Sequence, residues 1–323
     1  MTTDTIMLRP ATASDLESMC ALHQRADRHD GVPRVLTLEE LREELDGDRV
    51  SLDTDVRLAS VDGQIVGYAH TFYLPSEVSQ ERCYVFGNVD PEFRRRGVGT
   101  ALLAWGVERG SEQLRSSGSD LPKYLRVDGY DYQEDRHRLF ERMGFAKVRW
   151  FEELIRPLTD LPDVPTIDGL TILPWDATRD DEIREAKNAA FEDHWGSTPI
   201  NDHNWQQMVH GVSARADLSF FAVEDATGRV VAHCVNHRYE GDAGVTGRQD
   251  AWIDNLGTLR EWRGKGVASA LIAASLHAFA GAGFTHACIG VDGENPTGAA
   301  RLYRALGFDR VQRAITHEIR VDA

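Results

Sequence analysis

The chain of 323 residues repeats itself. Three pairs of segments match in the same order and at nearly the same separation: 7–10 with 172–174, 94–99 with 263–268, and 139–145 with 302–308. One such match arises easily by chance, whereas three collinear matches indicate two copies of one structural unit. The length suits two domains of ordinary size. We therefore expect an N-terminal domain over residues 1–156 and a C-terminal domain over residues 168–323.

A proline-rich stretch separates the two copies. Residues 157–167 contain Pro157, Pro162 and Pro165, and proline continues neither a helix nor a central strand, so this stretch is expected to be a linker. Each copy begins with short apolar runs joined by turn signals, followed by a strand, a Gly-rich turn, a helix, another strand and another helix. This order predicts an α+β fold in which each copy has a mixed, mostly antiparallel sheet flanked by helices.

Charge and composition narrow the function. The net charge is -16 and no basic tail is present, which argues against a nucleic-acid partner because phosphate binding needs clustered positive charge. The most apolar stretch, 267–284, contains serines and a histidine and predicts a buried helix rather than a membrane span. The N-terminal residues do not resemble a signal peptide, and the four cysteines are scattered, so a cytoplasmic protein is expected. The 12 histidines form no zinc-type cluster with cysteine, so no metal is expected.

The repeated Gly-rich turn suits an anionic ligand. Each turn follows a predicted strand and precedes a predicted helix, whose free N–H groups and positive dipole end attract a pyrophosphate. The turn matches neither the GxxxxGK[ST] pattern of a P-loop nor the GxGxxG of a dinucleotide site. A tight structural turn also needs glycine, but a turn that occurs twice with arginine in the same place favours a functional site.

The turns at 94–99 and 263–268 resemble the Q/R-x-x-G-x-G/A signature of the GNAT acetyltransferase superfamily. Asn295 followed by LYxxLGF at 302–308 resembles the later motif of that superfamily. The resemblance covers both halves and is the more specific in the second. It implies a tandem GNAT acetyltransferase that uses acetyl-CoA as its acyl donor. It also implies that acyl-CoA lies in a V-shaped opening between the strand before the turn and the next parallel strand.

The resemblance also implies which residues contact acyl-CoA. In the C-terminal copy they are Leu256, Gly257, Thr258, Arg263, Gly264, Lys265, Gly266, Val267, Ala268, Ser269 and Asn295. In the N-terminal copy they are Gly87, Asn88, Val89, Arg94, Arg95, Arg96, Gly97, Val98, Gly99 and Thr100. The backbone N–H groups of the turns are expected to hold the pyrophosphate. Residues 131–133 stand where the N-terminal copy would need a counterpart of Asn295.

One substitution separates the copies chemically. Tyr303 stands at the family's position for the acid that protonates the leaving thiolate, and Phe140 stands at the matching position of the first copy. A phenyl ring donates no proton. We therefore expect the C-terminal copy to be catalytic and the N-terminal copy to be non-catalytic, although both rings are equally consistent with packing alone.

The general base is less sharply indicated. Asp254 precedes Thr258 by four residues on a predicted strand, and a period of two places both on one face of the sheet. We take Asp254 as the candidate base, with a solvated or ion-paired carboxylate as the alternative. His233 and His237 have the same parity on the preceding strand, where they serve either as proton relays or as structural histidines.

The acceptor is expected to be a primary amine of a small molecule. His194, Trp195 and Trp205 fall in the region that covers the acceptor in the family, and aromatic walls with a few polar groups suit such a pocket. Both tryptophans are equally consistent with a core position. The protein is expected to be a monomer or a homodimer.

Two alternatives remain open. The tandem layout also resembles mycothiol synthase, which acetylates the cysteinyl amine of a sugar-linked thiol precursor. That family is expected to have a glutamate near Ala251 and Trp252, and this chain has none there. The other alternative is a non-catalytic CoA-binding or interaction module, against which the presence of Tyr303 and Asn295 argues.

Overall fold

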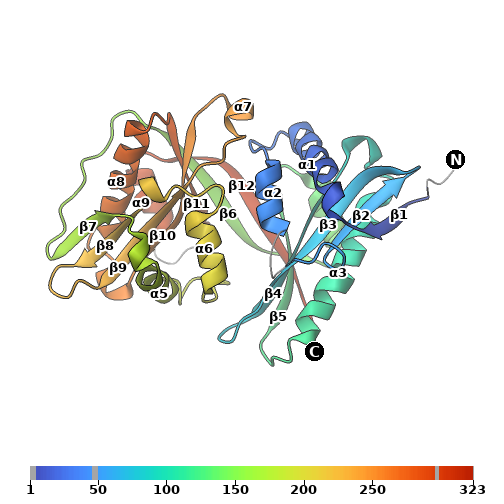
Figure 1. The fold of residues 1–323 in the computed structure, drawn as a ribbon, viewed down its shortest axis with the longest axis horizontal. Coiled ribbons are helices and arrows are strands. Elements are labelled where there is room, and N and C mark those ends of the chain that lie inside the picture. Colours follow the sequence, from blue (N-terminus) through green and yellow to red (C-terminus); the bar gives the residue numbers. More distant parts are fainter. Residues whose placement is uncertain (1–4, 46–49, 295–297, 323) are drawn as a thin grey trace. The chain divides into compact units, whose positions relative to one another are not determined.

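The computed structural model describes residues 5–45, 50–294 and 298–322. The chain divides into two compact units (Figure 1). Unit 1 comprises Met1–Trp150 with Ala314–Ala323, and unit 2 comprises Phe151–Arg313. The units depart from the expected boundaries at 156 and 168, because strands β6 (Ala146–Pro157) and β12 (Asp309–Arg320) each begin in one unit and end in the other.

Unit 1 holds a mixed sheet in the order β1-β2-β3-β4-β5-β12. Its further strands are β1 Met7–Pro10, β2 Val56–Val61, β3 Gln64–Leu74, β4 Glu81–Val89 and β5 Lys123–Tyr130. Its helices are α1 Leu16–Asp30, α2 Leu38–Leu45, α3 Val98–Ser116 and α4 Glu134–Arg142. Strands β4 and β5 run parallel, and the other neighbouring strands run antiparallel. Residues 314–320 of β12 pair with β5, so the end of the chain completes the sheet of unit 1.

Unit 2 repeats this plan in the order β6-β11-β10-β9-β8-β7. Its strands include β7 Leu170–Pro174, β8 Phe220–Glu224, β9 Val230–His237, β10 Asp250–Thr258 and β11 His286–Asp292. Its helices are α5 Asp180–Ala190, α6 Asp202–His210, α7 Ala243–Thr246, α8 Val267–Gly281 and α9 Ala299–Ala305. Strands β10 and β11 run parallel, and residues 151–157 of β6 pair antiparallel with β11. The expected α+β fold is confirmed, with mixed and mostly antiparallel strand pairing in each unit.

The parallel pair in each unit is joined over part of its length. The β10–β11 pairing runs from Asp250 opposite His286 to Ile253 opposite Ile289. The matching β4–β5 pairing of unit 1 ends where Tyr84 lies opposite Arg126. The cavities described below begin beyond these last pairs.

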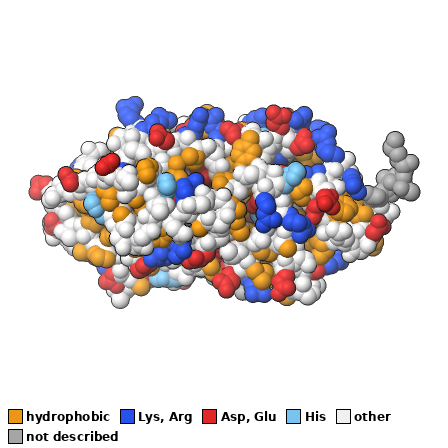
Figure 2. Space-filling model, turned by 90° about the horizontal axis from the view of Figure 1, so that it is seen from above, with side chains coloured by type: hydrophobic (Ala, Val, Ile, Leu, Met, Phe, Trp, Pro, Cys, Tyr) orange, Lys and Arg blue, Asp and Glu red, His pale blue; other side chains and the backbone are white. Residues whose placement is uncertain are grey.

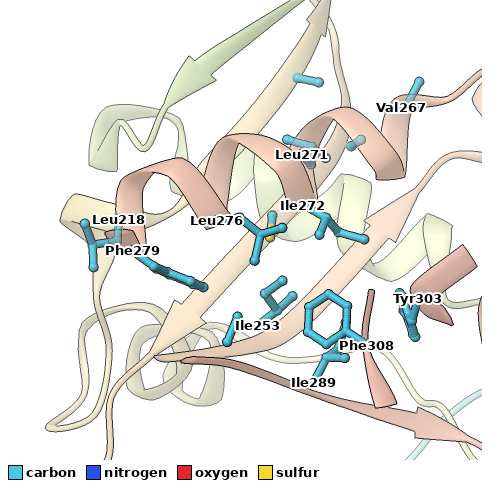
Figure 3. Close-up of a cluster of buried hydrophobic side chains, with 14 of the residues drawn as sticks. Leu218, Ile253, Val267, Leu271, Ile272, Leu276, Phe279, Ile289, Tyr303 and Phe308 are labelled. Atoms are coloured by element: carbon cyan, nitrogen blue, oxygen red, sulfur yellow. The ribbon is translucent and has the colours of Figure 1, made fainter. Parts of the chain in front are cut away.

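Helix α8 anchors the core of unit 2. The apolar stretch at 267–284 was expected to form a buried helix, and Leu271, Ile272 and Leu276 are each 0 % exposed. Figure 3 shows Ile272 and Leu276 pointing from α8 toward Ile253 of β10 and Ile289 of β11. Full burial of one such side chain contributes about 1.5–3 kcal/mol, so this layer holds α8 and its first turn against β10.

The surface and the helices place limits on other functions. On the face shown in Figure 2, basic and acidic side chains are interspersed, and hydrophobic ones are scattered among them. Across the described residues, no helix is both long enough and apolar enough to cross a membrane.

Candidate active site

Unit 2 contains a cavity of about 530 Å³ between β10, β11 and the starts of α8 and α9. It brings together Asp254, Leu256, Gly257, Thr258, Arg263, Gly264, Gly266, Val267, Ala268, Ser269, Tyr303 and His194 from the residues that the sequence predicted. Lys265, Trp195 and Trp205 do not belong to its lining. Asn295 lies outside the described residues.

The Gly-rich turn aims the start of α8 at this cavity. Gly264 and Gly266 have φ values of 75° and 86°, in the left-handed region that favours glycine. Gly266 is the N-cap, and α8 begins at Val267. The first N–H groups of a helix have no acceptor within the helix, and here the residues that carry them line the cavity. The turn therefore forms an anion-binding end of the kind expected for a pyrophosphate.

Arg263 holds the turn in place instead of facing a ligand. Its Nη1 and Nη2 atoms donate to the two carboxylate oxygens of Asp193 at 2.7 and 2.9 Å, and Nη2 also donates to Ala190 O at 2.7 Å. Its Nε donates to Thr258 O, and its backbone N–H donates to Arg260 O. The expectation that Arg263 offers an N–H to the pyrophosphate is thereby corrected, because these donors already have protein acceptors.

The Lys265 side chain lies outside the cavity, and the prediction for its backbone N–H stays a prediction. Its Nζ lies 4.4 Å from the centroid of the Trp262 ring, a cation–π distance, and Lys265 is exposed. The side chain therefore extends along the outer surface of the turn.

Asp254 lies at a bulge of β10. The register between β10 and β9 shifts between Ile253 and Asn255, so Asp254 has no partner in the ladder. The period of two that placed Asp254 on the same face as Thr258 breaks at this point. Asp254 still lines the cavity, and its side chain is 31 % exposed. The bulge therefore presents a carboxylate to the cavity from the middle of a strand.

His237 stands behind Asp254. Its Nε2 is 2.7 Å from Met208 O, and because a carbonyl only accepts, Nε2 carries a proton. Its Nδ1 lies 3.7 Å from Asp254 Oδ1. His237 is therefore positioned to orient Asp254 or to share a proton with it.

His233 has a structural role. It is 0 % exposed, and its Nε2 lies 2.8 Å from Asn255 Oδ1. Burial lowers the pKa of His233 to about 4, so the ring is neutral at pH 7. It does not line the cavity, and a Cβ placed at Gly257 would meet its Cε1 at 2.4 Å. The proton-relay hypothesis for His233 finds no support in this position.

Tyr303 reaches the cavity from α9. The side chain is 7 % exposed, and its ring packs edge-on against Phe308 with centroids 6.3 Å apart (Figure 3). Burial, with a smaller contribution from Cys234, raises the pKa of Tyr303 above its ordinary value. The phenol therefore keeps its proton at neutral pH, which a proton donor requires.

The aromatic residues near the acceptor region separate into two groups. His194 lines the cavity, and its ring lies 5.3 Å from that of Phe191. Trp195 lies behind the lining, with its ring 6.5 Å from that of Phe151, a lining residue. Trp205 is 0 % exposed and belongs to a separate core cluster. The expected role of Trp205 at the acceptor is corrected, because burial in that core leaves it no access to the cavity.

The cavity has an acidic character. Its charged lining residues are Asp193, Asp254, Asp292 and Arg263. Arg263 and Asp193 pair with each other, and their hydrogen bonds lower the pKa of Asp193 and raise that of Arg263. The Asp254 carboxylate at the bulge favours a cationic molecule in the cavity.

Unit 1 contains a corresponding cavity of about 750 Å³. From the predicted residues it gathers Gly87, Asn88, Val89, Arg94, Arg95, Gly97, Gly99 and Thr100. Arg96 and Val98 do not line it: the Arg96 guanidinium lies over the Phe93 ring, and Val98 is in the core. Phe140 lines this cavity as Tyr303 lines the other, so the two rings occupy matching places.

Arg94 is engaged in the same way as Arg263. Its Nη1 and Nη2 donate to Asp30 at 2.5 and 3.1 Å, its Nε donates to Val89 O, and its backbone N–H donates to Pro91 O. The expectation that Arg94 donates an N–H to a pyrophosphate is corrected for the same reason.

Three residues at these sites were missed by the sequence analysis: Asp193, Asp292 and Arg136. Asp30 and Asp193 are separated in the chain by the same number of residues as Phe140 and Tyr303. This shared spacing could have identified the two aspartates as matching residues of the two copies. Asp292 ends β11 inside the cavity. Arg136 follows β5 and lines the cavity of unit 1, where its partners depend on the tertiary structure.

Family models match both halves of the chain. Residues 180–308 match the model of the acetyltransferase (GNAT) family, and residues 53–147 match that of an acetyltransferase (GNAT) domain. These matches cover both Gly-rich turns.

Individual proteins match across both units. A mycothiol acetyltransferase from Mycobacterium sp. (strain JLS) is 26% identical over 298 residues, which is 88% of each chain. One from Thermobispora bispora is 32% identical over 229 residues, covering 69% of this chain and 71% of the relative. The crystal structure of a GCN5-related N-acetyltransferase from Sphaerobacter thermophilus superimposes with a TM-score of 0.76 at 25% identity, covering 98% of this chain and 96% of the other.

Proposed function

The chain belongs to the acetyltransferase (GNAT) family, and on that premise we propose that unit 2 transfers the acetyl group of acetyl-CoA to a primary amine of a small molecule. One observation carries this proposal. A single cavity of about 530 Å³ joins a helix N-terminus, the carboxylate of Asp254 and the phenol of Tyr303.

The donor end of the cavity is the start of α8. Acetyl-CoA supplies a thioester that carries the acyl group. The backbone N–H groups of Val267, Ala268 and Ser269 are placed to bind its pyrophosphate. The strand end at Leu256–Thr258 lines the opening beside them and offers backbone groups to the pantetheine arm.

The acceptor end lies at Asp254. An alkyl amine has a pKa near ~10.4, so at neutral pH it arrives as a cation and must lose a proton before it attacks. The Asp254 carboxylate favours the cation and, supported by His237 at 3.7 Å, accepts the proton.

The leaving group requires a proton donor. A thiolate with a pKa near ~8.5 departs more easily when a neighbouring acid protonates it as the C–S bond breaks. Tyr303 lines the same cavity and keeps its proton because burial raises its pKa. The corresponding Phe140 provides no proton, which supports a non-catalytic unit 1.

Paired substitutions at the two helix starts test this assignment. Ala268→Trp places a large ring in the cavity of unit 2, and Gly99→Trp does the same in unit 1. Thiol release from acetyl-CoA is followed with a panel of small amines. We expect Ala268→Trp to abolish turnover and Gly99→Trp to leave it within about twofold. Full activity in a folded Ala268→Trp protein would refute the assignment. Binding of acetyl-CoA without thiol release for any amine would favour the non-catalytic binding module.

A second candidate names the acceptor. Two relatives that cover both units are mycothiol acetyltransferases, which favours the free-amine precursor of mycothiol as the acceptor. We expect a kcat/KM for that precursor at least tenfold above that for a simple amino sugar if this candidate is correct. Equal values would favour a different small amine.

A further inference from the structure

Arg136 crosses the opening between β4 and β5 in unit 1. The last pair of these parallel strands is Tyr84 with Arg126, and Gly87 and Gly129 lie three residues further along each strand. The Arg136 stem lies against Gly129, where an added Cβ would meet its Cδ at 2.9 Å. Its Nη2 donates to Asn88 Oδ1 at 2.5 Å and lies 3.5 Å from Gly87 O. One side chain thus spans from one strand to the other at the level where the pairing has ended.

The contacts of Arg136 continue into a series of hydrogen-bonded polar side chains inside unit 1. Asn88, which is 5 % exposed, donates through Nδ2 to Asp27 Oδ1 at 3.3 Å. Asp27 Oδ2 lies 2.9 Å from His23 Nε2, and His23 Nδ1 lies 2.5 Å from the Tyr68 hydroxyl. Because the guanidinium is anchored at the end of this series of hydrogen bonds, its displacement would leave buried polar groups without partners, which is unfavourable.

The electrostatic surroundings also hold the guanidinium. Burial lowers the pKa of Arg136, and the nearby carboxylates of Asp30 and Asp27 act in the opposite direction. The guanidinium therefore lies close to two acidic residues of the same unit.

Among the residues of unit 2 that the structure describes, the matching place holds an alanine instead of an arginine. Arg136 and Ala299 are separated in the chain by the same number of residues as Phe140 and Tyr303, and each lies in the first turn of the helix that carries that ring. Ala299 lines the cavity of unit 2 with a methyl group. The strand ends at Leu256–Thr258 and Gly87–Val89 both line their cavities. Among the described residues, a guanidinium contacts the strand end in unit 1, where Arg136 Nη2 lies 3.5 Å from Gly87 O.

We propose that Arg136 closes the opening of unit 1 to acyl-CoA, so that each chain binds one acyl-CoA, in unit 2. This inference rests on the proposed function for the binding in unit 2. It replaces the expectation that both Gly-rich turns hold the donor. A Gly-rich turn with intact glycines is then not enough to bind acyl-CoA. The pantetheine arm also needs the strand end that Arg136 occupies.

Binding stoichiometry tests the proposal directly. Isothermal titration of the full chain with acetyl-CoA should give one site for the wild type and two for Arg136→Ala, which copies Ala299. Arg138→Ala is the matched control, because Arg138 lies on the same helix, is 58% exposed in its side chain and pairs with Glu134. It should keep one site. Two sites in the wild type would overturn the proposal, as would one site in a folded Arg136→Ala protein.

A second background identifies which unit binds. Ala268→Trp should bind no acetyl-CoA, and Ala268→Trp with Arg136→Ala should regain one site without regaining turnover. A wild-type protein with no binding at all would instead refute the proposed function. Residual one-site binding in Ala268→Trp would show that unit 1 is open. The wild-type and Ala268→Trp titrations remain decisive even if Arg136→Ala fails to fold.

Discussion

Arg263 donates hydrogen bonds to both carboxylate oxygens of Asp193, at 2.7 and 2.9 Å. Asp193 follows α5, and Arg263 begins the Gly-rich turn, so this pair ties the acceptor side of the cavity to its donor side. Unit 1 has the same arrangement in Arg94 and Asp30. The arginine of the repeated motif therefore positions the turn in both units.

Asp193→Asn should loosen the turn of unit 2. Charge-assisted hydrogen bonds typically contribute about 1.5–3 kcal/mol, and the 38% exposure of the Asp193 side chain reduces this to about 1 kcal/mol. We expect the melting temperature to fall by roughly 2–4 °C and the KM for acetyl-CoA to rise about tenfold. The control is Glu261→Gln in the exposed pair of Arg229 and Glu261, which should change neither quantity. An unchanged KM would show that the pair does not position the turn.

Tyr303→Phe should lower kcat without weakening acetyl-CoA binding. The ring and its edge-on contact with Phe308 are kept, and the hydroxyl alone is lost. A positioned general acid contributes about 10²–10⁴ in rate, which corresponds to roughly 3–5 kcal/mol of barrier. Steady-state kinetics give the rate, and calorimetry gives the affinity. The exposed Tyr132→Phe serves as control. A variant that keeps most of the wild-type rate would assign Tyr303 a packing role.

Asp254→Asn should slow the reaction by about 10²-fold near neutral pH, because the amine loses its proton acceptor. The loss should shrink as the pH approaches ~10, where a growing share of the free amine is already neutral. A purely structural defect would persist at every pH. The rate is measured from pH 7 to 10 against the wild type, with the exposed Asp202→Asn as control. A constant ratio of the two rates across this range would contradict the base role.

Acid should destabilise the protein through two buried histidines. Burial lowers the pKa of His233 and of His317 to about 4, the latter with help from His137 at 5.0 Å. Their pKa in the unfolded chain is about 6.5, so below that value the unfolded state binds protons that the folded state excludes. Stability is therefore full above pH 6.5 and declines toward pH 4. Each histidine should lower the free energy of unfolding by on the order of 2 kcal/mol when the pH falls from 7 to 5.

His317→Phe tests this linkage. A phenyl ring suits the apolar neighbour Phe140 and does not titrate. The free energy of unfolding is measured with urea at pH 7 and at pH 5. Between these two values, it should fall by about 2 kcal/mol less in the variant than in the wild type. The exposed His203→Gln should behave like the wild type. An equal loss in His317→Phe would show that this ring is not the source of the pH dependence.

Chelation should leave turnover unchanged. The described residues contain no group of three or more His, Cys, Asp or Glu side chains arranged to hold a metal ion. The chemistry proposed for Asp254 and Tyr303 requires proton transfer alone. Activity after incubation with EDTA should stay within error of the untreated protein, and recovery of lost activity by zinc would contradict this prediction.

Local sequence patterns determined much of this protein. The three repeated segments predicted two α+β units, the glycines at 264 and 266 predicted a turn before a helix, and the apolar stretch at 267–284 predicted a buried helix. These features depend on short-range geometry: a left-handed backbone favours glycine, and one face of a helix needs apolar residues. The exchange of Tyr303 for Phe140 was equally visible in the sequence.

The tertiary structure alone decided how the side chains are used. It paired Arg263 with Asp193, shifted the register at Asp254, and buried Trp205 away from the cavity. It also laid Arg136 across the opening of unit 1. A motif specifies the backbone of a turn, but the partner of an arginine depends on which distant residue the fold brings within about 3 Å. The sequence therefore shows which residues differ between the two units, whereas the contacts that those residues make are long-range and are encoded by no local pattern.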